Sequence, residues 1–169
     1  MDVIRPITHP RSKEHQFVLS ITDYFLKWVE AVPLREVKTS DVIEFIKYHV
    51  IYYFGIPRRV VHDNGPQFVS QVFQRFCNKF RMQSVSSTVC YPAANGLAEA
   101  FNNTIGKLFK KFISKSQRDW DEKFGDCLWS YRTTVRIPMK DTPFSLVYEC
   151  EVVHPLETQI PSLSIALMI

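Results

Sequence analysis

The sequence predicts an α/β domain with a central mixed β-sheet flanked by α-helices. Short runs rich in β-branched and aromatic residues alternate with longer runs whose apolar residues recur every three or four positions. The runs follow the order strand, strand, helix, strand, helix, strand, long helix, helix, which allows a mixed sheet with helices on both faces. The chain has 169 residues, of which 46% are hydrophobic and 22% charged, so it can bury one full core.

We expect three parts along the chain. Residues 1–16 contain Pro6, Pro10 and mixed charges, and are interpreted as an irregular lead-in. Residues 17–150 carry the alternating runs and are expected to form the folded domain. Residues 151–169 lack a clear period and are interpreted as a tail or linker.

Four short runs are predicted to be strands. Residues 17–22 and 28–32 are expected to pair as a hairpin, and Pro33 is expected to weaken or end the second strand. Residues 59–62 and 82–88 are the other two. The first and third of these strands each end at a carboxylate, Asp23 and Asp63.

The helices are predicted from capping residues and apolar spacing. Thr39 or Ser40 is expected to cap a helix that Gly55 stops, and Ser70 to begin a second. A long helix over about 95–115, another over 119–132 and a short one opened by Thr142-Pro143 follow. In the long helix, Phe101, Ile105, Leu108 and Phe112 form one apolar arc, with Ala98 and Phe109 at its edge, and Glu99 faces away from it.

Composition and charge narrow the class of protein. The net charge of +4 and pI of about 8.9 permit a polyanionic partner without requiring one. The four cysteines are scattered and are interpreted as reduced thiols rather than a zinc site. No apolar run is long enough to cross a membrane and no signal peptide opens the chain, so we expect a soluble nuclear or cytoplasmic protein.

Asp23, Asp63 and Glu99 are the candidate site. Ligand and metal groups collect at strand ends in α/β sheets, so Asp23 and Asp63 would lie side by side if their strands are neighbours. Oxygen ligands suit Mg²⁺ or Mn²⁺, which would also neutralise the repulsion between close carboxylates. Each residue also has a structural interpretation that stays open: a strand-end turn, an ordinary D-N-G turn and a solvated helix charge.

Several segments resemble the integrases of gypsy-type retrotransposons. Residues 23–31 are similar to the segment that carries the first catalytic Asp in that family. Residues 62–68 look like its D-N-G-x-Q-F motif, and residues 92–99 look like its P-x-A-N-G-x-x-E motif. Thirty-five residues separate Asp63 from Glu99, which is the D-D-35-E spacing of retroviral-type integrases. The likeness begins at residues 1–4 and covers nearly the whole chain.

The resemblance implies a ribonuclease H-like fold and Mg²⁺- or Mn²⁺-dependent 3′-end processing and strand transfer, which join element DNA ends to target DNA. It implies that Asp23, Asp63 and Glu99 hold the metal, and that Asn64, Gln67 and Asn95 lie beside it and touch DNA. It also favours a homo-oligomer. Lys107 and Lys110 lie on a basic side of the long helix, which is either a DNA contact or a solvated face.

Departures from the family pattern leave alternatives open. This chain has Ala93 and Leu97 where the family commonly has Gln, and Asn103 where a basic residue is usual. Gly106 lies within the helix, where Gly costs about 1 kcal/mol relative to Ala. A catalytically impaired or reused nucleic-acid-binding domain, or a protein-interaction module, would show the same motifs.

Overall fold

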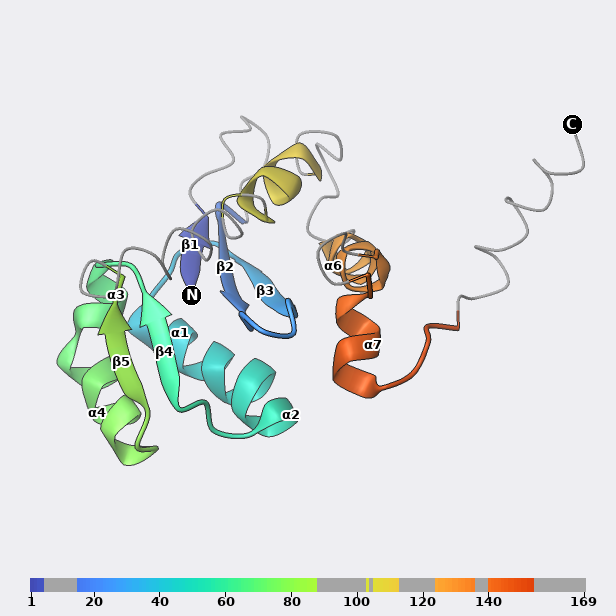
Figure 1. Ribbon diagram of the computed structural model, residues 1–169. Helices are drawn as coiled ribbons and strands as arrows, with labels where there is room; N and C mark the ends of the chain where they lie inside the picture. The colour runs from blue at the N-terminus through green and yellow to red at the C-terminus, as the bar shows by residue number, and fades with distance from the viewer. Residues whose placement is uncertain (5–14, 88–102, 104, 113–123, 136–139, 154–169) are drawn as a thin grey trace, which may run out of the picture.

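The computed structural model describes residues 1–4, 15–87, 103, 105–112, 124–135 and 140–153 (Figure 1). The strands are β1 (Asp2–Ile4), β2 (Phe17–Thr22), β3 (Val29–Leu34), β4 (Arg59–His62) and β5 (Gln83–Ser86). The helices are α1 (Thr39–Ile46), a π-helical segment (Lys47–Ile51), α2 (Tyr52–Phe54), α3 (Pro66–Val69), α4 (Gln71–Lys79), α6 (Phe124–Thr133) and α7 (Pro143–Tyr148). A further helix includes residues 105–112. Within these ranges no helix is long and apolar enough to cross a membrane.

The strands form a mixed arrangement, as predicted. β1, β2 and β3 make an antiparallel sheet in that order, and β4 pairs with β5 in parallel. The predicted hairpin of β2 and β3 is confirmed, but β3 continues through Pro33 to Leu34, with Pro33 opposite Val18. Proline is tolerated there because β3 pairs on one side only in this sheet and loses no ladder bond on the other.

The lead-in expected to be irregular contains strand β1. Asp2 pairs with Ser20 and Ile4 with Val18. On its other side, the Met1 amino nitrogen donates a hydrogen bond of 2.6 Å to the Val61 carbonyl oxygen. β1 therefore lies between β2 and β4 and joins the two sheets.

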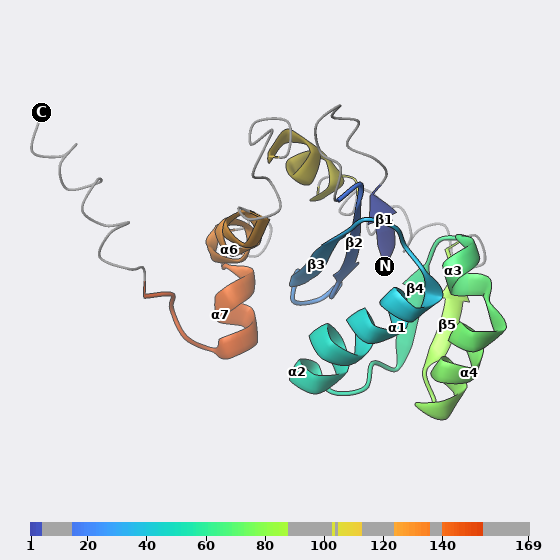
Figure 2. The ribbon, with the colours of Figure 1, turned by 180° about the vertical axis from the view of Figure 1, so that it is seen from behind.

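The two faces of the antiparallel sheet pack against different helices. On β2, Val18 belongs to one buried cluster and Leu19 to the other, because successive side chains of a strand point to opposite faces. The first cluster includes Phe109 of the 105–112 helix and Leu128 of α6. The second includes side chains of α1, α3 and α4. Figures 1 and 2 show this division, with the 105–112 helix and α6 on one side of the sheet and α1 on the other.

The helix after β3 differs from the prediction at its start. Its N-cap is Lys38, whose backbone N–H donates to Asp41 Oδ2 at 2.9 Å, while the Thr39 hydroxyl donates to the Gln67 carbonyl oxygen. The predicted stop at Gly55 is confirmed, and its φ of 83° is a left-handed value that glycine adopts easily.

The π-helical segment changes which residues of that helix are buried. Val42 and Ile46 are buried, but Tyr53, which follows them at regular α-helical spacing, is 75% exposed. A π turn holds more residues than an α turn, so it rotates the side chains that follow it out of the buried face.

The 105–112 helix is rotated from the predicted arc. Ile105 is buried as predicted, but Phe109 is fully buried while Leu108 is 39% exposed. Phe109, predicted to lie at the edge of the arc, is therefore at its centre, where it packs against Phe124 of α6. Ala98 and Phe101 lie outside the described residues.

Side chains of α6 join it to the antiparallel sheet. The Tyr131 hydroxyl donates to the Lys27 carbonyl oxygen at 2.9 Å, and Arg132 donates to the Val29 carbonyl oxygen and pairs with Glu30. The N-cap predicted for α7 is confirmed, since the Thr142 hydroxyl accepts from the Ser145 N–H at 3.0 Å.

Candidate functional site

Asp63 directly follows strand β4 and opens a tight turn. Its Oδ1 accepts the Gly65 N–H at 3.0 Å, and the Gly65 carbonyl oxygen accepts the Phe68 N–H at 3.0 Å. A Cβ on Gly65 would lie 2.9 Å from Gln67 Cδ and 3.0 Å from Asp63 Oδ1, so only glycine fits without moving these side chains. The turn therefore holds an exposed carboxylate and the Gln67 amide next to each other.

A buried histidine fixes the backbone beneath Asp63. His62 Nδ1 lies 2.6 Å from the Asp63 carbonyl oxygen, and because a carbonyl can only accept, Nδ1 carries the hydrogen. In the neutral ring Nε2 is then an acceptor, 2.8 Å from the Ser84 hydroxyl, which in turn accepts from Gln74 Nε2. The ring also stacks on Phe68, with centroids 5.1 Å apart. This network attaches the turn to β5 and α4.

The turn also places Asn64 and Gln67 at the same edge of the parallel pair. The Ser86 hydroxyl at the end of β5 donates to Asn64 Oδ1. Pro66 begins α3, whose Phe68 is fully buried and anchors the segment. Asn64 is exposed and Gln67 half-buried.

Asp23 occupies a turn of a different kind. It follows β2, and its Oδ1 accepts the N–H groups of Phe25 and Leu26, both at 2.8 Å. Its own N–H donates to the Trp28 carbonyl oxygen. The carboxylate thus organises the connection between β2 and β3, which is the strand-end turn that sequence reasoning had left open.

The structure does not bring Asp23 beside Asp63. Their strands are not neighbours, because β1 lies between them. β2 also runs opposite to β1, whereas Figure 1 shows β1 and β4 pointing the same way. Asp2 pairs with Ser20, and Asp23 lies three residues after Ser20 along β2. Asp23 is therefore about 10 Å beyond the level of Asp2, in the direction that leads away from Asp63. The two carboxylates lie at opposite edges.

Asp2 is the carboxylate that the strand order places near Asp63. It is on β1, and the preceding residue is bonded to Val61, two residues before Asp63. Burial lowers the pKa of the Met1 amino group to about 6, and the negative charges of Asp2 and Asp63 both act on this group in the opposite direction. Sequence reasoning missed Asp2, although the β-forming residues Val3 and Ile4 beside it were the signal of a strand.

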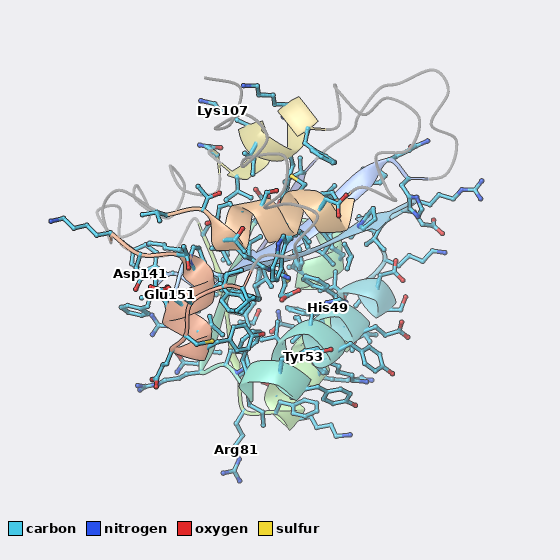
Figure 3. All side chains as sticks on the ribbon, turned by 90° about the vertical axis from the view of Figure 1, so that its right-hand side faces the viewer. His49, Tyr53, Arg81, Lys107, Asp141 and Glu151 are labelled. Carbon is cyan, nitrogen blue, oxygen red and sulfur yellow. The ribbon has the colours of Figure 1, made fainter. Side chains whose placement is uncertain are left out.

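The remaining predicted residues divide into two groups. Glu99 and Asn95 lie outside the described residues. Lys107 and Lys110 are exposed on the 105–112 helix, whose opposite side buries Ile105 and Phe109 (Lys107 is labelled in Figure 3). The part of the chain that the structure describes contains no cluster of three or more His, Cys, Asp or Glu residues able to hold a metal ion.

Residues 1–92 match the family described as integrase core domain. The chain belongs to this family. Among solved structures, it is similar to the HTLV-2 integrase catalytic core domain in complex with magnesium, with a TM-score of 0.63 and 23% identity over 86% of this chain and 95% of that one. It also resembles a chain of the simian T-cell lymphotropic virus intasome, with a TM-score of 0.66, 24% identity and coverage of 91% and 56%. The fold is therefore the ribonuclease H-like fold of retroviral integrase cores.

Curated relatives are longer proteins. The chain is 25% identical over 144 residues to the gypsy retrotransposon integrase-like protein 1 of Bos taurus, which covers 85% of this chain and 28% of the relative. It is 27% identical over 166 residues to the transposon Tf2-3 polyprotein of Schizosaccharomyces pombe, which covers 97% and 12%. This integrase core thus spans between about a tenth and a third of these relatives.

Proposed function

We propose that this integrase core catalyses 3′-end processing and strand transfer of DNA, with Asp2, Asp63 and Glu99 holding Mg²⁺ or Mn²⁺. The observation that carries the proposal is the strand order, which brings β1 and its Asp2 next to the end of β4 and Asp63. Asp23, the first carboxylate expected from the sequence, is left out because its oxygen serves the β2–β3 turn. Glu99 stays in the proposal on the strength of its motif.

The donor chemistry of Asp2 and Asp63 fits a hard divalent cation. Carboxylate oxygens are the ligands that Mg²⁺ and Mn²⁺ prefer. The negative charges of Asp2 and Asp63 both act on the Met1 amino group, and together they favour a cation near the two carboxylates. When bound, such ions activate a nucleophile and stabilise the leaving oxygen in phosphodiester displacement. The protein supplies the fixed turn: Gly65 and the buried His62 hold the Asp63 backbone in one position.

We assign the DNA contacts to residues around that turn. Asn64 and Gln67 share the edge with Asp63, and Asn95 joins them by its motif position. Lys107 and Lys110 carry exposed cationic groups that suit phosphate oxygens. The proposed substrates are element ends and target DNA, which the chain would meet in the nucleus.

The proposed assembly is a homo-oligomer. A related core, that of HTLV-2 integrase, has been solved in trimeric and dimeric forms. On this chain, Tyr48, Tyr52 and Tyr53 expose aromatic surface that a second copy would cover. Tyr131 and Arg132 bond within the chain, to Lys27 and Glu30, and are not part of this exposed surface.

The second candidate is a DNA-binding integrase remnant without catalysis. Asn103 is exposed on the helix where the family usually has a basic residue, and one relative is itself named integrase-like. Such a chain would bind DNA in a salt-sensitive way and show no metal-dependent cleavage.

The test is calorimetric binding of Mn²⁺ to the chain, alone and with a short DNA duplex. Asp2→Asn and Asp63→Asn should each weaken binding at least about tenfold, because even outer-shell partners of metal ligands are worth that much. Asp23→Asn is the matched control, since it makes the same change at the opposite edge, and should leave Mn²⁺ affinity unchanged. Loss of binding in Asp23→Asn equal to that in Asp2→Asn would reject the assignment of Asp2. No carboxylate-dependent binding even with DNA would favour the remnant.

A further inference from the structure

The positive charge of this chain is concentrated in about one quarter of its length. Residues 45–87 contain six Lys or Arg residues and a single acidic residue, Asp63. The rest of the chain contains 15 basic and 16 acidic residues. The net charge of +4 therefore arises entirely from the part that forms the π-helical segment, β4, α4 and β5.

The fold gathers most of these charges where the two parallel strands begin. Arg58 and Arg59 open β4, and Arg81 comes two residues before β5. The Gln83 N–H donates to the Arg58 carbonyl oxygen at 3.0 Å, and Arg59 Nε donates to Gln83 Oε1 at 3.3 Å, so the two strand starts lie side by side. Lys79 ends α4, directly before this turn.

One further cation extends this group along α4. Arg75 lies four residues before Lys79, and both are exposed, so they share the solvent face of the helix. We call the five exposed residues the basic edge: Arg58, Arg59, Arg75, Lys79 and Arg81. Like charges four residues apart on a helix repel, and among the described residues none of the five forms an ion pair. The basic edge therefore projects an uncompensated positive field.

Arg81 has a backbone conformation that glycine would adopt more easily. Its φ is 54°, and its N–H bonds to the Asn78 carbonyl oxygen while the Met82 N–H bonds to that of Cys77. This is the helix-ending motif whose left-handed position is usually Gly. The buried Met82 anchors the turn, and Figure 3 shows the Arg81 side chain projecting away from the molecule.

We propose that the basic edge binds the phosphate backbone of double-stranded DNA at a surface separate from Asp2 and Asp63. Asp63 follows the far end of β4, a four-residue strand that spans about 13 Å. The basic edge has the cations that backbone contact needs, and backbone contact requires no metal. It would hold one stretch of duplex while the surface around Asp2 and Asp63 engages another. This inference goes beyond the proposed function, because it holds whether or not the chain is catalytic.

The test measures binding of a labelled duplex of arbitrary sequence, in EDTA, over a range of salt concentrations. Arg81→Gly should weaken binding on the order of fivefold near 0.1 M salt and reduce the slope of log K against log salt by about 0.9. Its melting temperature should be unchanged or higher, because Gly relieves the left-handed strain. Arg75→Gln/Lys79→Gln should reduce the slope by about 1.8.

Lys140→Gly is the matched control. Lys140 is also exposed with a φ of 55°, so this variant loses one positive charge and one left-handed side chain away from the basic edge. Unchanged binding in the control supports the proposal. An unchanged slope in Arg81→Gly, an equal loss in the control, or binding to anionic lipid vesicles but not to duplex would overturn it. Because EDTA removes the metal, a failure here leaves the metal site proposed above intact.

Discussion

Arg132 should be one of the largest single contributors to the stability of this fold. From α6 it reaches strand β3, where Nη2 lies 2.7 Å from Glu30 Oε1 and 2.8 Å from the Val29 carbonyl oxygen. Its guanidinium also lies 4.2 Å from the centre of the Trp28 ring, and Trp28 Nε1 donates to the same Glu30 oxygen at 2.8 Å. The Arg132 and Glu30 side chains are only 17% and 15% exposed.

Arg132→Ala should destabilise the protein by about 3–4 kcal/mol. Removal of one partner of a largely buried ion pair costs about 3–5 kcal/mol, because the other charge stays desolvated. Loss of the contact with Trp28 adds about 0.5–1 kcal/mol, while the residual exposure of both side chains lowers the total. For a chain of this length, the expected fall in melting temperature is about 10 °C.

The assay is equilibrium unfolding in urea at neutral pH, followed by fluorescence. Lys38→Ala is the control, because Lys38 pairs with Glu36 on the surface, where the two side chains are 62% and 63% exposed, and such pairs contribute little. The double variant Arg132→Ala/Glu30→Gln should be less destabilised than the sum of its single changes, since it leaves no unpaired charge. If Arg132→Ala shifts the urea midpoint no more than Lys38→Ala does, the ion pair does not hold α6 to the sheet.

Two further predictions concern the turn at the site and the thiols. Gly65→Ala should weaken Mn²⁺ binding, because its Cβ would lie 2.9 Å from Gln67 Cδ and force that side chain to move. The control is Gly125→Ala on α6, where the added Cβ meets open space, so this variant should keep its Mn²⁺ affinity and gain up to about 1 kcal/mol of stability. Equal Mn²⁺ affinity in both variants would contradict this role of the turn. Burial raises the pKa of the Cys127 thiol to about 11, so at pH 8 an alkylating reagent should label the exposed Cys150 before Cys127. Labelling of Cys127 should increase as the pH rises towards that value. Peptide mass spectrometry measures both rates, and equal rates at pH 8 would refute the prediction.

Features that depend on neighbouring residues could be predicted from the sequence. Ser70 was expected to begin a helix, and its hydroxyl accepts the Phe73 N–H at the start of α4. Thr142 was expected to cap α7, and it does. The hairpin of β2 and β3 was predicted because its strands are separated by a short turn. The two caps are hydrogen bonds between residues three positions apart, and the hairpin joins strands that follow one another along the chain.

Features that depend on an irregular helix turn or on distant residues could not be predicted in this way. The π-helical segment turned Tyr53 out to solvent, and packing against α6 made Phe109 the centre of its helix face. Local periodicity treats a helix as regular and isolated, so it has no information about either effect. Pairing of the first residues with β2 and β4 likewise gave structure to a segment that looked irregular.

The candidate site shows the same division. The sequence alone determined the family and the turn that presents Asp63, because these are carried by short motifs. Which second carboxylate lies near Asp63 depended on tertiary structure, through the bond between Met1 and Val61 and the reversal of chain direction between β1 and β2. An aspartate at a strand end is a local property, whereas the edge of the sheet on which it lies is set by strand order and direction. For that reason the assembled strands place Asp2, and not Asp23, near Asp63.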